Sequence, residues 1–141
     1  DQELAREWTE RAKRLKDAFN DAFWLPDRGY YALALDRSKR PVDALASNIG
    51  HCLWTGIIDE ARAGSVVAHL MGPEMFSGWG VRTLASSMAA YNPMSYHNGS
   101  VWPHDNAIIA SGLSRYGYVA EAERVAVGIL DAADLLGAQS P

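Results

Sequence analysis

The chain has little cysteine, no excess of basic residues and no long apolar run. Cys52 is the one cysteine among 141 residues, so no disulfide can form within the chain. A lone free cysteine favours a cytoplasmic location. The formal net charge of −4 argues against nucleic acid as a partner, because nucleic acid requires a basic face. A membrane span needs about 18 consecutive apolar residues, and the sequence has none. We therefore expect a cytoplasmic protein with neither nucleic-acid nor membrane partners.

Several motifs that carry chemistry are also missing. The sequence has no P-loop, no Gly-x-Ser-x-Gly elbow and no dinucleotide fingerprint, which excludes the common nucleotide, hydrolase-triad and NAD sites. His97, His104 and Asp105 lie close together in sequence. However, adjacent residues on a helix point about 100° apart, so His104 and Asp105 are poorly placed to chelate one ion. We expect no metal and no cofactor.

What the sequence does have is helical periodicity in an ordinary globular composition. Forty-eight per cent of the residues are hydrophobic, 21% are charged, and the length suits one domain. Apolar residues three and four apart predict helices over 2–23, 48–58, 59–71, 103–116 and 119–136. Residues 30–35 are a short apolar run between turn residues, which indicates a strand or extended loop. The predicted fold class is all-α, built from helical hairpins, with a short β segment near 30–36.

Three local predictions concern helix ends and helix faces. The apolar stripe of the first helix predicts a core-facing side with a charged outer side. Ser47 and Ser100 are the expected N-caps of the second and fourth helices, and Gly56 is not expected to end the second. His51 and His69 lie on apolar helices, where an interior or boundary imidazole is the favoured interpretation over a catalytic one.

The richest stretch in chemistry runs from Tyr91 to Asn106. It holds two Tyr, two His, three Asn, one Trp and one Asp within sixteen residues. Pro103 suits the first turn of a helix, and the free N–H groups of that turn point back toward the preceding loop. Residues 73–101 show little helical periodicity, and a long irregular segment inside a compact domain is usually functional. This loop and the helix start are therefore predicted to line a polar pocket.

The block Tyr91-Asn-Pro-Met-Ser-Tyr-His-Asn-Gly-Ser-Val-Trp-Pro-His-Asp-Asn106 resembles the glycogen-debranching, amylo-α-1,6-glucosidase-like glycoside hydrolases. The resemblance extends to residues 29–36, 43–56 and 75–84. It implies an (α/α) toroid, a ring of six helical hairpins with the sugar site at one end. Five helices cannot close such a ring. The resemblance thus implies that residues 1–141 are a C-terminal part of a catalytic domain, completed by the remainder of that domain or by self-association.

The expected substrate is an oligosaccharide or glucoside. The candidate substrate-binding residues are Trp79, Arg82, Tyr96, His97, Asn98, Trp102, His104 and Asp105. Indole faces pack on pyranose rings, while phenol, imidazole and amide groups suit sugar hydroxyls. For Trp79 and Trp102, core packing remains an equal alternative. For Arg82, pairing with a buried carboxylate is slightly favoured over a role as a substrate clamp.

Glycoside hydrolysis requires two carboxyl groups across the scissile bond, and this stretch offers only Asp105. In a helix first turn, Asp105 is better suited to accept sugar hydroxyls or act as a base than to be a general acid. In the families that the chain resembles, the acid Asp lies in an earlier segment and the base Glu in a later one. Neither segment is matched, so the catalytic pair is unassigned. We expect part of an α-glucan hydrolase; the alternatives are a non-catalytic carbohydrate-binding or assembly module and a hydrolase of a small glucoside or mannoside.

Overall fold

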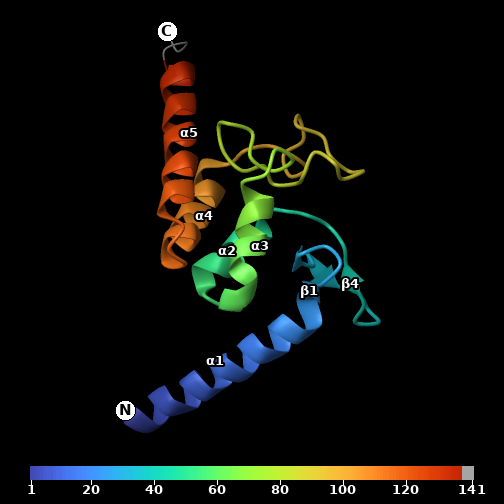
Figure 1. The fold of residues 1–141 in the computed structure, drawn as a ribbon, viewed down its shortest axis with the longest axis vertical. Coiled ribbons are helices and arrows are strands. Elements are labelled where there is room, and N and C mark those ends of the chain that lie inside the picture. Colours follow the sequence, from blue (N-terminus) through green and yellow to red (C-terminus); the bar gives the residue numbers. More distant parts are fainter. Residues whose placement is uncertain (138–141) are drawn as a thin grey trace.

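The computed structural model describes residues 1–137 and is mostly helical, as the periodicity predicts (Figure 1). Within that range there are five α-helices: α1 (Gln2–Phe23), α2 (Asn48–Thr55), α3 (Glu60–Leu70), α4 (Pro103–Arg115) and α5 (Val119–Gly137). The all-α prediction is confirmed. No helix in the described part of the chain is both long enough and apolar enough to cross a membrane.

The short β segment is confirmed as two small antiparallel hairpins between α1 and α2. Strand β1 (Trp24–Leu25) pairs with β2 (Tyr30–Tyr31), and β3 (Ala34–Leu35) pairs with β4 (Pro41–Val42). Tyr30 and Tyr31 are both buried. Asp36, in the turn between β3 and β4, accepts bonds from the backbone N–H groups of Ser38 and Arg40. Residues 36–40 thus form the polar turn that joins β3 to β4.

The connections between helices alternate in length. Residues 24–47 and 71–102 are long connections, whereas α2–α3 and α4–α5 are joined by short turns at 56–59 and 116–118. The two long connections meet where Ala46 pairs with Leu84 and the Ser47 N–H donates to the Thr83 carbonyl. The helical hairpins therefore carry their long loops together at one end, which is where a site built from loops must lie.

The core sits between α2, α3, α4 and the long connections. Its largest fully buried apolar side chains come from these segments, from the α2–α3 turn and from α5, and they are Tyr31, Leu53, Ile58, Val66, Leu70, Met75, Val81, Ile109, Leu113 and Val125. Burying such side chains contributes roughly 1.5–3 kcal/mol each relative to leaving them exposed. The irregular segment 71–102 is thus fixed to the helices by its own core residues rather than by regular secondary structure.

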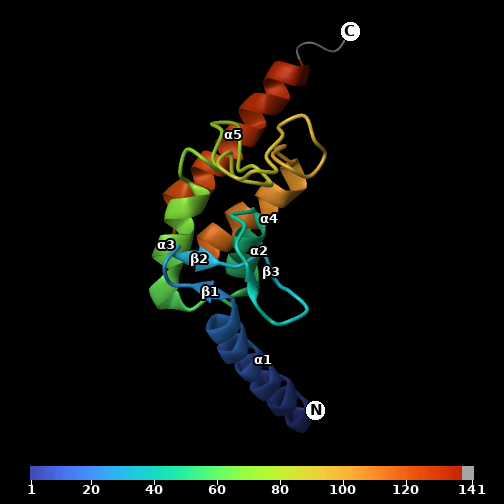
Figure 2. The same ribbon diagram turned by 90° about the vertical axis from the view of Figure 1, so that its right-hand side faces the viewer.

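The prediction that α1 faces the core is wrong for most of its length. Asn20 is the one buried residue of α1, while Leu4, Trp8 and Leu15 are 51%, 55% and 61% exposed. Only the last turns pack, through Phe19 stacked on Tyr31. Figures 1 and 2 show why: α1 extends away from the other helices, so its apolar stripe has no partner within residues 1–137.

Two predicted helix ends also differ from the structure. Helix α2 ends at Gly56, whose φ of 76° places it in the left-handed region that favours glycine. Ser47 is at the N-cap of α2 but makes no side-chain cap bond. The N-cap of α4 is Trp102 rather than Ser100. The Ser100 hydroxyl instead donates to the Tyr96 carbonyl, because the loop before α4 folds back on itself.

Candidate functional site

A cleft of about 270 Å³ lies at the loop end of the molecule, beside the starts of α2 and α4. Four of its lining residues are among those expected from the sequence, and three come from other segments: His97, Trp102, His104 and Asp105, with Ser47, Asn48 and Thr83. The start of α4 thus supplies part of the cleft lining, and the start of α2 and the two long connections supply the rest.

Aromatic rings form one wall of the cleft. Trp102 lies at the centre of this wall, with the Tyr96 ring 4.4 Å away, His104 at 5.0 Å and His97 at 5.7 Å between ring centroids. The Trp102 indole N–H donates to the Tyr96 carbonyl at 3.0 Å and to the Ser100 hydroxyl at 2.9 Å. These bonds hold the indole in one orientation. An indole held in this way offers a flat apolar face of the kind that packs on a pyranose ring.

Asp105 is the carboxylate of the cleft, and it is buried, with 6% of the residue exposed. Its Oδ1 accepts a hydrogen bond from the Nε2–H of His51 at 2.5 Å. Its Oδ2 is also buried but has no hydrogen-bond partner among the described residues. An unsatisfied buried acceptor is costly in a folded protein, and a carboxylate oxygen more so. Asp105 therefore has capacity to accept a donor from a molecule bound in the cleft.

Asn106 explains how the irregular segment is held at the start of α4. Its fully buried side-chain amide accepts from the Val81 N–H at 2.7 Å and donates to the Val81 carbonyl at 3.1 Å. It also donates to the Trp102 carbonyl at 2.9 Å. The Asn106 amide thus satisfies both the N–H and the carbonyl of Val81, which lies in a segment without regular secondary structure. Asn106 shapes the cleft without lining it.

The other expected site residues are placed differently. Tyr96 is 69% exposed and forms the outer edge of the aromatic wall, and Asn98 is exposed in the same loop. Trp79 is 45% exposed and does not line the cleft; its backbone lies against Gly128 of α5. The Arg82 guanidinium faces the carbonyls of Pro73 and Met75, at 3.5 and 3.4 Å. No carboxylate pairs with it among residues 1–137, so the favoured pairing is not observed. Substrate contact stays a prediction for all eight expected residues, and Trp79, Arg82, Tyr96 and Asn98 do not line the cleft.

His51 is the cleft-side residue that the sequence did not place in the site. The sequence predicts an interior or boundary imidazole, and the boundary position is confirmed: the His51 side chain is 39% exposed and hydrogen-bonded to Asp105. The signal was weak because the two residues are 54 positions apart. The neighbouring Cys52 is no nucleophile at neutral pH, because burial raises the pKa of its thiol to about 11.

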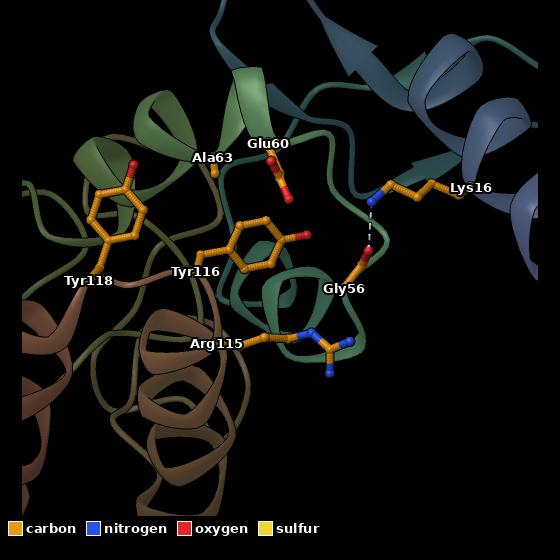
Figure 3. Close-up of a pocket in the computed structure, with 7 residues that line it drawn as sticks. All are labelled: Lys16, Gly56, Glu60, Ala63, Arg115, Tyr116 and Tyr118. Carbon is orange, nitrogen blue, oxygen red and sulfur yellow. Dashed lines mark hydrogen bonds between the residues drawn. The ribbon is translucent and has the colours of Figure 1, made fainter.

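A second cavity, of about 450 Å³, lies at the short-turn end (Figure 3). Two of its polar side chains, Lys16 and Tyr116, are hydrogen-bonded to the backbone of the chain. The Lys16 ammonium donates to the Gly56 carbonyl at 3.0 Å, and the Tyr116 hydroxyl donates to the Ile58 carbonyl at 2.7 Å. Lys16 is placed at the carboxyl end of α2, where a cation is favourable. This cavity therefore lacks the buried, unpartnered acceptor that distinguishes the cleft at the loop end.

No set of three or more His, Cys, Asp and Glu side chains within residues 1–137 is grouped as a metal site requires. The arrangement in the loop-end cleft is instead an aromatic wall facing a carboxylate. Such a combination suits a neutral polyhydroxylated ligand, which offers C–H faces to the rings and hydroxyl donors to the acid.

Comparison with known proteins agrees with that chemistry. The family model for the mannosylglycerate hydrolase MGH1-like glycoside hydrolase domain matches residues 1–139. A mannosylglycerate hydrolase from Rubrobacter radiotolerans is 30% identical over 125 residues, which are 85% of this chain. The chain spans 28% of the length of that curated relative.

Solved structures show the same fold. The crystal structure of a GH63 mannosylglycerate hydrolase from Thermus thermophilus with Tris matches with a TM-score of 0.67 at 21% identity, over 81% of this chain and 28% of that one. The neutral trehalase Nth1 from Saccharomyces cerevisiae matches with a TM-score of 0.75 at 19% identity, over 89% of this chain and 23% of that one. The five helices correspond to part of the (α/α) toroid of these enzymes.

Proposed function

The chain belongs to the MGH1-like glycoside hydrolase family, and from this membership we propose that the complete protein hydrolyses a small mannoside of the mannosylglycerate type. In this proposal the chain is one part of an (α/α) toroid and provides substrate-contacting residues around the loop-end cleft. The observation that carries the proposal is the buried Asp105 carboxylate, which has one unpartnered oxygen beside the Trp102 wall.

The proposed role of Asp105 is to bind a hydroxyl group of the sugar. A hydroxyl donor from the ligand would satisfy Oδ2, while the sugar's C–H face packs on the indole of Trp102. His97 and His104, on the same wall, supply ring nitrogens to further hydroxyls. A charge-assisted hydrogen bond of this kind is stronger than a neutral one and, when buried, contributes strongly to orientation.

Hydrolysis itself needs a second carboxyl group across the scissile bond. Asp105 is the one carboxylate that lines the cleft in the described part of the chain. The proposal therefore assigns the complete acid and base pair to the assembled domain and gives this chain the task of holding the sugar. The chain's coverage of 28% of the curated relative is consistent with a domain that extends well beyond these residues.

Two substrate classes are open to this site, and a specific observation favours each. The Rubrobacter relative and the Thermus structures carry the name mannosylglycerate hydrolase, and one Thermus structure contains D-glycerate. The block from Tyr91 to Asn106 instead resembles that of the glycogen-debranching glycoside hydrolases, which act on α-linked glucans. The family match over residues 1–139 favours the compact mannoside over the branched glucan.

An activity assay on the complete gene product tests both parts of the proposal. We expect hydrolysis of mannosylglycerate with little release of glucose from a branched α-glucan. Asp105→Asn should lower kcat/KM by about 10²-fold or more, because the amide presents an N–H donor where a carboxylate oxygen accepts. Unchanged turnover in this variant would remove Asp105 from the site, and preference for the glucan would reassign the substrate.

Asp36→Asn is the matched control. It makes the same chemical change at a carboxylate in the β3–β4 turn, bonded to Arg40 and away from the cleft. Its kcat/KM should equal that of the wild type. A comparable loss in both variants would indicate a general effect on folding rather than a role in substrate binding.

A further inference from the structure

Helices α2 and α4 approach each other unusually closely, and two glycines make this possible. A Cβ on Gly112 of α4 would lie 2.8 Å from the Gly50 carbonyl oxygen and 2.7 Å from the Trp54 nitrogen. A Cβ on Gly50 of α2 would lie 2.6 Å from Cγ1 of Ile109. Real side-chain carbons do not come so close, so any larger residue must push the helices apart. The spacing between the two helices is therefore fixed by backbone contact.

This close spacing brings His51 and Asp105 together. His51 is in the first turn of α2 and Asp105 in the first turn of α4, so each is held by a rigid element rather than by a loop. Since a carboxylate can only accept, the Nε2–H of His51 is the donor in the 2.5 Å bond to Oδ1. Within residues 1–137 this is the one hydrogen bond that the imidazole makes to another residue.

The bond occupies one oxygen of Asp105 and leaves the other for a ligand. Without the His51 N–H, both oxygens would be unpartnered in a site where the residue is 6% exposed. The carboxylate would then rotate or draw in water, because a buried charge without a donor is strongly unfavourable. The position of the Asp105 carboxylate, which belongs to the cleft, thus depends on a residue that does not itself line the cleft.

We propose that His51 is a positioning residue: it holds Asp105 through Oδ1 so that Oδ2 faces the cleft as the acceptor for a hydroxyl of the bound glycoside. This inference rests on the proposed function, since it requires that Asp105 contact the sugar. It adds that the α2–α4 helix pair, rather than the loop alone, sets the geometry of sugar binding.

The test compares three substitutions of His51 in the complete gene product. His51→Leu removes the donor and should lower kcat/KM by about 10²-fold, the usual effect of misplacing a substrate-holding group by about 1 Å. His51→Gln has an amide N–H that reaches as far as Nε2 and should stay within about tenfold of the wild type. His51→Asn has the same amide but is one carbon shorter, so it should resemble His51→Leu. If His51→Leu fails to fold, the comparison of Gln with Asn carries the test.

The double variant His51→Leu/Asp105→Asn separates a shared role from two independent ones. If His51 acts through Asp105, the double variant should be no worse than Asp105→Asn alone. Multiplied losses, or full activity in His51→Leu beside a large loss in Asp105→Asn, would overturn the positioning role and leave the proposed function intact. Full activity in Asp105→Asn would instead overturn the proposed function, and the positioning role with it.

His69→Leu is the control for loss of a helix imidazole. The Nε2–H of His69, on α3, donates to the Arg28 carbonyl at 3.0 Å and is not part of the cleft. Its loss should leave kcat/KM and KM unchanged. Melting temperatures recorded for every variant show whether an activity loss follows stability; equal activity losses in His51→Gln and His51→Leu at matched stability would also overturn the proposal.

Discussion

Arg28, Tyr30 and Asp43 tie the first long connection together through one shared carboxylate. The Tyr30 hydroxyl donates to Oδ1 of Asp43 at 2.5 Å, and the Arg28 Nε–H donates to Oδ2 at 2.7 Å. The hydrogen bond from Tyr30, followed by those from Arg28, lowers the pKa of Asp43 below its ordinary value of 3.8. Burial, and then the bond to Asp43, raises the pKa of Tyr30 to about 12.

The two shifts predict opposite pH dependences at the two ends of the pH scale. Asp43 adds to the free energy of unfolding above pH 3.8, and this contribution is lost as the pH falls through its lowered pKa. Tyr30 adds stability below pH 10.0, and this is lost as the pH rises toward about 12. Tyr30→Phe should therefore lower the free energy of unfolding at neutral pH. It should also make that free energy depend less on pH at both the acid and the alkaline end, which denaturant unfolding of the complete gene product at a series of pH values would show.

Tyr118→Phe is the control for loss of one phenol, because the Tyr118 hydroxyl makes no hydrogen bond to another residue in the range 1–137. Its free energy of unfolding should depend on pH as that of the wild type does, at both the acid and the alkaline end. Tyrosinate absorbance gives an independent measure. Burial also raises the pKa of Tyr31 and Tyr116, so Tyr30→Phe should have one late-ionising phenol fewer than the wild type, and Tyr118→Phe should have the same number. The same pH dependence of the free energy of unfolding in the wild type and in Tyr30→Phe would contradict the prediction.

At the scale of single residues, the sequence predicts those cleft residues that are close together along the chain. Trp102, His104 and Asp105 are consecutive or nearly so, and their helix start was visible from Pro103. The sequence predicts the boundary position of His51 but not its bond to Asp105, because the two residues are 54 positions apart. Ser100 was misassigned as a cap because its hydroxyl bonds within the loop, which no local pattern reveals.

At the scale of elements, the spacing of α2 and α4 is a testable cause of the cleft geometry. Alanine in place of glycine inside a helix normally stabilises by about 1 kcal/mol. Gly112→Ala should instead destabilise by roughly 1–3 kcal/mol, because the new Cβ would meet backbone atoms of α2 at 2.7 and 2.8 Å. Separating the helices also lengthens the bond from His51 to Asp105, so kcat/KM should fall even where the protein remains folded.

Gly64→Ala on α3 is the matched control for this change. The nearest atom to a Cβ there is the Tyr118 hydroxyl oxygen at 3.3 Å, the end of a side chain that can move. This variant should be neutral or slightly more stable in thermal unfolding, with unchanged activity. A Gly112→Ala protein as stable and active as Gly64→Ala would show that the helix spacing is not fixed by these glycines.

The helices themselves were predictable, because each has a periodic apolar face and most have a clear end signal. Helix α3 begins directly after Asp59, where the periodic pattern starts, and α5 ends within one residue of the prediction. Gly56 was not predicted to end α2, because a glycine inside an apolar run gives no sign of a left-handed φ until the following turn is known. The sequence predicts little helical periodicity over 73–101, within the irregular segment 71–102. It does not predict how Asn106 holds this segment, because that depends on a hydrogen bond between residues 25 positions apart.

At the scale of the whole molecule, α1 is the feature that residues 1–137 do not account for. Leu4, Trp8 and Leu15 form an apolar stripe that is half or more exposed, and the helix projects away from the others (Figure 2). Soluble proteins rarely expose such contiguous apolar surface unless it is an interface. Because the chain spans 28% of its curated relative, we propose that further parts of the same domain cover the stripe.

This proposal makes Leu15 a buried residue in the complete gene product, although it is 61% exposed here. Leu15→Asp should then destabilise the complete protein by about 1–3 kcal/mol, whereas a substitution at an exposed site usually changes stability by less than about 0.5 kcal/mol. Lys13→Asp, also at an exposed position of α1, is the control, and it should change the free energy of unfolding by less than about 0.5 kcal/mol. Equal, small effects would mean that the stripe stays in solvent. A loss in Leu15→Asp that disappears at low protein concentration, together with concentration-dependent sedimentation of the wild type, would assign the covering surface to a second copy instead.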